Sequence, residues 1–105
     1  MTSNEPYSEQ VRLKGLEWCD LDAAARMLEE GKTTYLAQRM AALGDIPVSK
    51  AEKTVKASED WADYVKKMVN AKTRANKARI ELEYLKMRYW EESGNAATRR
   101  AEMRM

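Results

Sequence analysis

The side chains of this sequence that could do chemistry are almost all lysines, arginines, aspartates and glutamates. Histidine is absent, and cysteine occurs once, as Cys19. Because histidine is the commonest general base and the commonest zinc ligand, its absence argues against both kinds of site. Glycine-rich phosphate loops and the CxxC, HExxH and GxSxG motifs are also missing. The sequence therefore predicts a protein that is not an enzyme and needs no cofactor or metal.

The acidic residues and the cysteine have ordinary structural interpretations. Acidic pairs occur at Glu29-Glu30, Asp60/Asp63, Glu81/Glu83 and Glu91-Glu92. Each pair falls on the expected exposed face of a helix, where carboxylates usually pair with cations one turn away. Cys19 cannot form an internal disulfide, and we expect it to be a small buried residue beside Trp18. An intermolecular disulfide or a reactive thiol at Cys19 is the alternative.

Cations dominate the stretch between Asp63 and Glu81, which contains no acid. We call these six residues the basic strip: Lys66, Lys67, Lys72, Arg74, Lys77 and Arg79. Residues 1–60 carry a net charge of −3 and residues 61–105 a net charge of +5. A basic strip on a helix is the electrostatic footprint of phosphate contacts. The same charges would also suit an acidic protein partner, or pairing with the acidic half of this chain or of another subunit.

The C-terminal tail adds further cations to this basic half. Arg99, Arg100 and Arg104 lie in it, and Met103 and Met105 are its apolar residues. We group the three arginines with the basic strip as candidates for binding nucleic acid or an acidic partner.

From Trp61 onward, apolar residues alternate at spacings of three and four. These residues, which we call the seam, are Trp61, Tyr64, Met68, Ala71, Ala75, Ala78, Leu82, Leu85 and Tyr89. Four heptads of this kind are typical of a helix that packs lengthwise against another helix. The repeat predicts one helix over 58–92, about 50 Å long at ~1.5 Å per residue. The alanines at the centre of the seam would let a partner helix approach closely.

A second apolar stripe lies on this helix, roughly opposite the end of the seam. We call it the second stripe, and it consists of Ile80, Tyr84, Met87 and the neighbouring Trp90. A helix that is apolar on two faces needs a cover on both. Residues 96–105, another subunit and a separate protein partner are the candidates for that cover, and Tyr, Trp and Met are favoured interface anchors. We assign the second stripe as the partner-binding site and expect a homodimer.

Residues 20–43 are the best candidate for the helix that covers the seam. Their apolar positions keep one face: Leu21, Ala24, Ala25, Leu28, Tyr35, Leu36, Met40 and Leu43. Asp20 has the residue type of an N-cap, and Gly44 suits a left-handed residue after the last turn. The apolar phase continues across Gly31, which favours one helix over two. Residues 1–10 show no periodicity, and residues 11–18 could form a short extended or single-turn segment around Gly15, so residues 1–19 are expected to be flexible or irregular.

A short linker follows at 45–48, where Pro47 disfavours helical geometry in the residue before it. Ser49 to Glu52 then matches a capping box and predicts a short helix to about Ala57. Ser58 is a further cap candidate.

Gly94-Asn95 predicts a stop and a restart, with a last short helix over 96–104. The expected fold is therefore all-α: an antiparallel helical hairpin with one long heptad-patterned helix and short capping helices, in a single domain over 20–105. No apolar run approaches the ~18 residues of a membrane span, and no signal peptide is evident. We expect a cytoplasmic protein without membrane contact.

The C-terminal half resembles small all-helical proteins that bacteriophages and prophages encode near single-strand-annealing recombination genes. The residues that carry this likeness are the pattern AR-x-x-LE-x-x-KMRYWEESGNAATRRAEMRM from Ala78 to Met105, preceded by AEKTVKAS from Ala51 to Ser58. Its most specific part is Tyr89-Trp90 followed by Asn95-Ala-x-x-Arg99-x-x-Glu102. The resemblance implies a phage-type protein that acts in the host cytoplasm on nucleic-acid machinery, and it implies no catalytic residue.

These observations predict a non-enzymatic binding protein. The leading hypothesis is an inhibitor of a host defence complex, in the manner of an anti-CRISPR protein, or of a nuclease complex, acting through protein–protein contacts. The alternatives are a DNA-binding accessory protein of phage recombination and a structural coiled-coil component.

Overall fold

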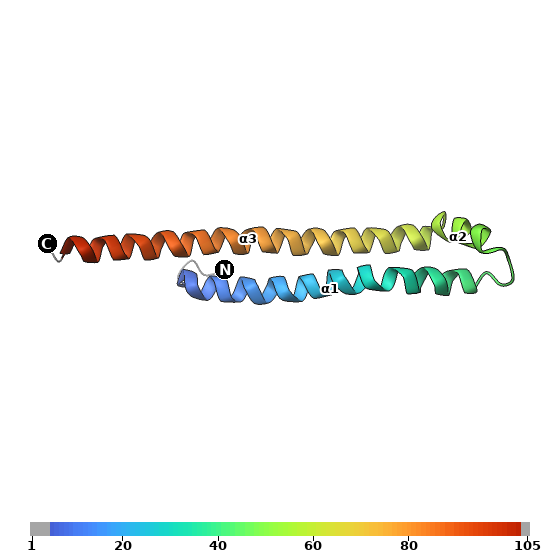
Figure 1. The fold of residues 1–105 in the computed structure, drawn as a ribbon, viewed down its shortest axis with the longest axis horizontal. Coiled ribbons are helices and arrows are strands. Elements are labelled where there is room, and N and C mark those ends of the chain that lie inside the picture. Colours follow the sequence, from blue (N-terminus) through green and yellow to red (C-terminus); the bar gives the residue numbers. More distant parts are fainter. Residues whose placement is uncertain (1–4, 104–105) are drawn as a thin grey trace.

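The computed structural model describes residues 5–103, apart from the side chain of Ala96. Over this range every regular element is an α-helix, and the helices are α1 (Tyr7–Ala41), α2 (Val48–Lys56) and α3 (Glu59–Met103). The all-α prediction is therefore confirmed. Figure 1 shows α1 and α3 side by side, with α2 at one end and the last turns of α3 projecting beyond α1 at the other. The molecule measures 83 × 23 × 16 Å.

Polar contacts between α1 and α3 define the register and relative direction of the two helices. At the start of α1, Arg88 Nη2 donates a hydrogen bond to Tyr7 Oη at 3.2 Å. Farther along α1, Tyr64 Oη donates to the carbonyl oxygen of Leu28 at 2.5 Å. Residue numbers thus rise along α1 while they fall along α3, so the two helices run in opposite directions.

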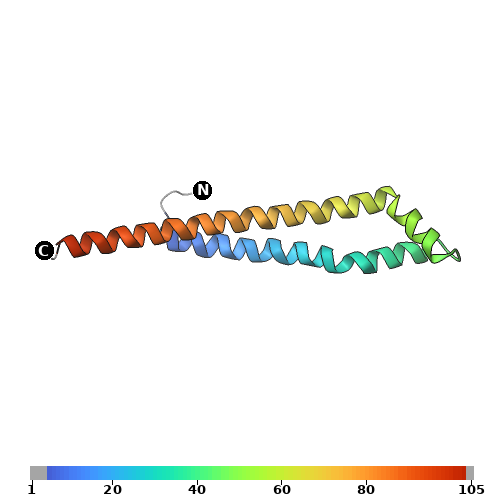
Figure 2. The same ribbon diagram turned by 45° about the horizontal axis from the view of Figure 1, so that its top comes forward.

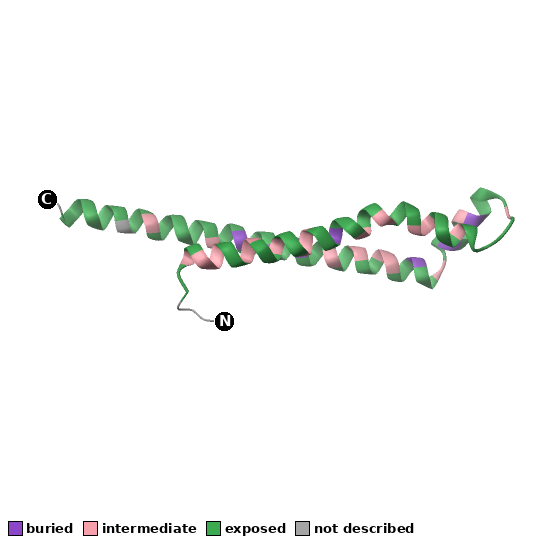
Figure 3. Cartoon of the chain, turned by 90° about the horizontal axis from the view of Figure 1, so that it is seen from below, coloured by how far each residue is buried: buried purple, intermediate pink, exposed green. Residues whose placement is uncertain are grey.

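The seam is the face of α3 that lies against α1. Its residues from Trp61 to Leu85 are buried or half-buried, and Ala75 is the most buried residue of the core at 2% exposure. Figure 3 shows buried and half-buried residues along the length where α1 and α3 lie together, while the projecting end of α3 is almost wholly exposed. Four of the seven buried hydrophobic residues in the described part of the chain are alanines. The core is therefore a thin line of small side chains.

The first helix begins thirteen residues earlier than its expected start at Asp20. Residues 1–19 were expected to be irregular, and this is wrong from Tyr7 onward because α1 is continuous from Tyr7 to Ala41. Asp20 lies inside α1 and caps nothing. The additional turns contribute Val11 and Trp18, which are half-buried and extend the face that packs on the seam. Burial of this longer face supplies the stability that an isolated terminal segment would lack.

Two expectations about α1 hold in the structure. The helix runs unbroken across Gly31, where a Cβ would lie only 3.2 Å from Tyr64 Oη. The missing side chain thus leaves room for the tyrosine that bonds to Leu28. Gly44 has a φ of +88°, the left-handed conformation expected after the helix, although α1 itself ends at Ala41 rather than Leu43.

At the α2 end the two long helices diverge, and α2 lies between them (Figure 2). Its Ala51 and Val55 are each 4% exposed. Next to them, Tyr35 of α1 stacks against two rings of α3, with ring centroids 4.5 Å from Tyr64 and 6.3 Å from Trp61. This aromatic cluster and α2 together form the widest part of the core.

The caps of α2 and α3 agree only in part with the sequence pattern. The capping box expected from Ser49 to Glu52 is wrong, because α2 already begins at Val48 and Pro47 is its cap. The Pro47 carbonyl accepts the Ala51 N–H at 2.9 Å, with no side-chain cap bond. Ser58 does cap α3, since the Trp61 N–H donates to Ser58 Oγ at 3.2 Å.

The stop expected at Gly94-Asn95 is also wrong. α3 continues through both residues to Met103, and Gly94 does not adopt a positive φ. Among the described residues, nothing beyond the adjacent helix backbone lies within 4 Å of a Cβ built on Gly94, so no tertiary contact there turns the backbone. The alanines, arginines and glutamate that follow are strong helix formers and carry the helix on.

Cys19 was expected to be buried and is exposed. The continuous α1 places Trp18 on the packed face, so the next residue, Cys19, is turned away from it by about 100°. Among the described helices, none has an apolar stretch that could cross a membrane.

Replacing Gly15 by alanine is expected to stabilise the fold by about 0.5–1 kcal/mol, because Gly15 lies in the interior of α1. A Cβ there would lie 3.9 Å from Leu82 Cδ1, an ordinary van der Waals contact. Gly44→Ala is the matched control and should destabilise by about 1 kcal/mol, since its φ is positive. Urea unfolding followed by circular dichroism measures both. A lower midpoint for Gly15→Ala would show that a Cβ does not fit beside Leu82.

Candidate functional site

The second stripe lies on the side of α3 that faces away from α1. Leu82 is buried in the seam at 6% exposure. Ile80 and Tyr84 lie two residues before and after it, and two residues turn a helix by about 200°. All four residues of the second stripe are accordingly open to solvent, with exposed fractions between 55% and 69%. The structure thus leaves these large apolar side chains on one exposed surface.

The C-terminal end of α3, as far as Met103, does not cover the second stripe. Residues 96–105 were one candidate cover, and this is wrong for the described part up to Met103. α3 is one continuous helix there, so its last turns extend along the helix axis and do not fold back. Figure 1 shows this end projecting past the start of α1.

Trp90 also lines a shallow hollow on the flank of the hairpin. The hollow has a volume of about 470 Å³, and its lining residues are Ser8, Val11, Lys86, Tyr89 and Trp90. Trp90 packs edge-on against Tyr89, with ring centroids 5.6 Å apart. The stripe therefore runs around α3, from the far face at Met87 to the flank where α1 begins.

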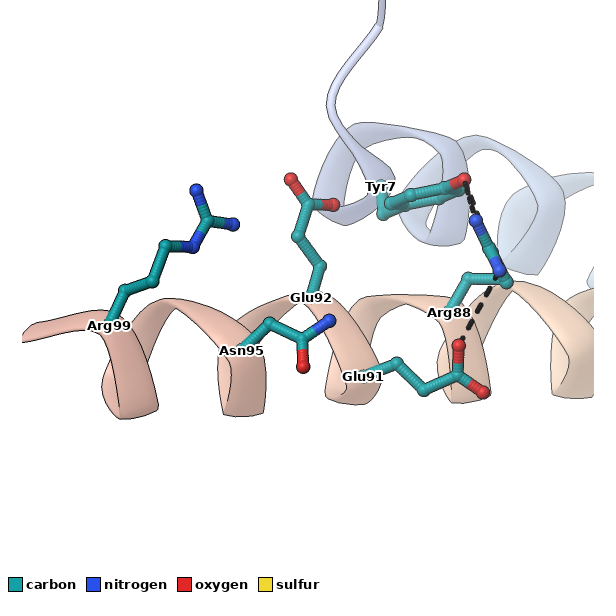
Figure 4. Close-up of a pocket in the computed structure, with 6 residues that line it drawn as sticks. All are labelled: Tyr7, Arg88, Glu91, Glu92, Asn95 and Arg99. Atoms are coloured by element: carbon teal, nitrogen blue, oxygen red, sulfur yellow. Dashed lines mark hydrogen bonds and ion pairs between the residues drawn. The ribbon is translucent and has the colours of Figure 1, made fainter. Parts of the chain in front are cut away.

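Sequence reasoning missed the contribution of α1 to this end of the molecule. Tyr7 lies in the segment that was expected to be irregular, yet it meets Arg88 of α3 (Figure 4). The guanidinium carbon lies 5.5 Å from the centre of the Tyr7 ring. The signal was present, because Tyr7, Val11 and Trp18 lie at spacings of four and seven, which keep one face of a helix as in the seam.

Arg88 is held by a small group of polar side chains. It donates to Tyr7 Oη and forms an ion pair with Glu91 at 3.5 Å. The bond to Tyr7 and the nearby charge of Glu91 raise the pKa of Arg88, which therefore stays protonated at any physiological pH. A hollow of about 230 Å³ beside it is lined in addition by Glu92, Asn95 and Arg99, as Figure 4 shows.

The basic strip is exposed throughout and is largely unneutralised. Lys72 forms an ion pair with Glu29 of α1 at 3.1 Å. The other five cations of the strip have no carboxylate within ion-pair distance among residues 5–103. Pairing with the acidic first half of the chain, one of the expected explanations, thus accounts for one residue of the six.

The tail arginines lie apart from the basic strip. Arg99 lines the hollow beside Tyr7, and Arg100 is exposed on the projecting end of α3. Arg104 lies outside the described residues. The structure therefore does not bring the tail and the strip together on one surface.

The acidic pairs act as partners for cations. Glu29, Asp60, Glu81 and Glu91 each contribute a carboxylate to an ion pair. Lys14 of α1 contacts both Glu17 and Glu81, at 2.7 and 2.8 Å, and these bonds raise the pKa of Lys14. Within the described part of the chain, no three His, Cys, Asp or Glu side chains are grouped so that they could hold a metal ion.

Comparisons with known proteins add no relative. The sequence matches no protein-family model. It has no significant similarity to a curated protein. No solved structure matches the fold of the chain.

Proposed function

We propose that this chain is a non-enzymatic protein that acts by associating with another protein through the second stripe of α3. The observation that carries the proposal is the exposure of Ile80, Tyr84, Met87 and Trp90 on one continuous helix surface. Monomeric proteins rarely expose several large apolar side chains side by side without a function for them. Tyr and Trp are also the residue types that most often dominate binding energy in an interface.

The expected partner surface is an apolar groove or an apolar helix face. An exposed helix stripe with spacings of three and four is typical of helix-in-groove and helix-to-helix recognition. The resemblance to phage-encoded proteins is the reason to look for the partner in a host defence or nuclease complex, which the chain would inhibit in the cytoplasm.

Alanine at Tyr84 or Trp90 is expected to weaken partner binding about 30-fold, the effect of losing one interface anchor of about 2 kcal/mol. The immobilised chain should capture a defined protein from a lysate of the source cell, and quantitative mass spectrometry should show its loss for both variants. Met27→Ala is the matched control, because Met27 is 74% exposed but lies on α1, away from the second stripe. The proposal fails if both stripe variants capture the partner as well as the unmodified chain does.

A second candidate function, DNA binding as an accessory to recombination, is favoured by the basic strip. Five of its cations lack an ion-pair partner among the described residues, so they are available to phosphates. Labelled single- and double-stranded DNA should bind at about 50 mM salt and dissociate at about 200 mM salt. Absence of binding at the lower salt concentration would exclude this candidate and leave the protein-binding proposal intact.

A further inference from the structure

The chain exposes more surface than a compact protein of its mass. Its accessible surface is 8352 Å², whereas about 6000 Å² is typical for 12.1 kDa. The radius of gyration is 23.0 Å, against about 13 Å for a compact domain of this length. The excess, on the order of 2000 Å², is larger than the roughly 800 Å² that each partner buries in a standard interface. Each copy therefore has the area for one stable interface.

The second stripe continues along α3 as a line of small residues. One line of side chains, with members seven residues apart, consists of Ile80, Met87, Gly94 and Ala101. The neighbouring line includes Tyr84 and Thr98. Large side chains thus occupy the half before Trp90, and small ones the half after it. The absence of a side chain at Gly94 relieves no contact in the described part of the chain, since nothing there lies within 4 Å of its Cβ position.

We propose that a second copy of this chain covers the second stripe, in an antiparallel arrangement about a two-fold axis beside Trp90 and Glu91. This inference rests on the proposed function, because it takes the second stripe as an association surface, and a second copy on that surface would compete with any other partner for it. The large half of each stripe then lies on the small half of the other. Met87 comes level with Gly94 of the second copy, and Ile80 comes level with Ala101.

Charged residues on one flank of the stripe are complementary in the same arrangement. Glu81, which also pairs with Lys14 of its own α1 at 2.8 Å, comes level with Arg99 of the second copy, and Lys77 comes level with Glu102. The two-fold axis repeats each pair, so four ion pairs flank the apolar contact. A parallel pair in the same register would instead place Glu81 beside Glu81 and Lys77 beside Lys77, and like charges at that distance are destabilising. The charges therefore select the antiparallel direction.

Glu91 is the acid nearest to the axis, where the two copies bring their Glu91 side chains close together. Arg88 lies one turn earlier on the same flank and already forms an ion pair with Glu91. The axis places Arg88 of each copy near Glu91 of the other. Two arginines thus face two glutamates, and the repulsion between the glutamates is offset.

The projecting end of α3 makes the overlap between the two copies long. Residues 80–101 overlap with the same residues of the second copy over about 32 Å of helix. α1 lies on the opposite face of α3 and begins beside Arg88, so neither copy of α1 obstructs the contact. The turns beyond α1, which have no other cover, gain the second α3 as a neighbour.

Sedimentation equilibrium tests the association directly. The chain should form dimers in the micromolar range, and Tyr84→Glu should weaken the dimer at least 30-fold, because it places a carboxylate in the apolar contact. Met27→Glu, which adds the same charge at an exposed site on α1, should leave the dimer unchanged. Circular dichroism of both variants controls for folding. A monomer at all concentrations up to about 0.5 mM, or a dimer that tolerates Tyr84→Glu, would overturn the proposal.

Cross-linking tests the direction of the two chains. Two preparations, each with Cys19→Ser, carry either Glu83→Cys or Thr98→Cys, and both sites are exposed. In the antiparallel dimer, position 83 of one copy lies level with position 98 of the other. The same position in the two copies is about 22 Å apart along the helix axis. A bis-maleimide with an arm of about 10 Å should therefore join the mixed preparations far more than either one alone. Efficient joining of like sites would overturn the antiparallel arrangement.

The two kinds of experiment distinguish dimerisation through the second stripe from binding of another protein through it. A chain that stays monomeric but loses its captured partner with Tyr84→Ala refutes the second copy and retains the stripe as a binding site. If the chain dimerises through Tyr84 but captures its partner equally well with alanine at Tyr84 or Trp90, the second copy is supported and the proposed function is refuted.

Discussion

Replacing Trp61 by alanine is expected to destabilise the fold by about 3–5 kcal/mol, the range for removing a buried aromatic side chain. Trp61 is 9% exposed and stacks with Tyr35 and Tyr64, with ring centroids 6.3 Å away in both cases. Lys32 lies over the indole at 5.8 Å and adds a cation–π contact. Because the rest of the core consists mainly of alanines, little else offsets this loss. The free energy of unfolding of a typical protein is only about 5–15 kcal/mol, so this substitution would remove much of it.

Urea unfolding followed by circular dichroism measures the effect of Trp61→Ala. Trp90→Ala is the matched control, since it removes the same side chain from a site that is 69% exposed. At low micromolar concentration, where association contributes little, the control should change stability by no more than about 0.5 kcal/mol. Equal effects of the two variants would show that the aromatic cluster is not the main support of the fold.

Leucine in place of Ala75 is expected to destabilise the fold by about 2 kcal/mol through overpacking. Ala75 is 2% exposed and lies at the centre of the seam, between Ala71 and Ala78. These three small residues set how closely α1 approaches α3, so a larger side chain must push the helices apart or leave its preferred rotamer. The loss should spread along the hairpin, because the packing of neighbouring seam residues depends on the same spacing.

The control for this variant is Asn76→Leu, at the next residue and on an exposed surface. It introduces the same side chain into α3 without entering the seam, and its effect on the urea midpoint should be small. If Ala75→Leu unfolds at the same urea concentration as the unmodified chain, the alanines do not determine the approach of the helices.

Sequence periodicity predicted α3 and its buried face well, because a heptad repeat reports directly on which residues face a partner helix. The same signal exists in Tyr7, Val11 and Trp18, upstream of the expected start at Asp20. An aspartate before an apolar run has the residue type of a helix start, and local capping signals cannot show that the helix already continues from farther upstream. The start of α1 at Tyr7 is determined by its packing on α3, which is distant in the sequence.

The continuation of α3 past Gly94 could not be predicted from local signals either. Glycine marks helix ends when the chain turns back on a tertiary contact, and sequence alone does not show whether such a contact exists. Without that knowledge, residues 96–105 were one candidate cover for the second stripe, beside another subunit and a separate partner. The candidate site itself was identified from spacing, whereas the role of Tyr7 beside Arg88 required the register between the two helices.

The difference between the two ends of the hairpin has a consequence for how the molecule opens. At one end α2 and the three stacked rings tie both long helices together, while at the other α1 begins with Tyr7 and α3 runs on alone. Amide hydrogens should therefore exchange with solvent in a gradient, slowest near Trp61 and fastest beyond Arg88. Under partial denaturation the helices would separate from the Tyr7 end first, and the region beside α2 would be the last to open.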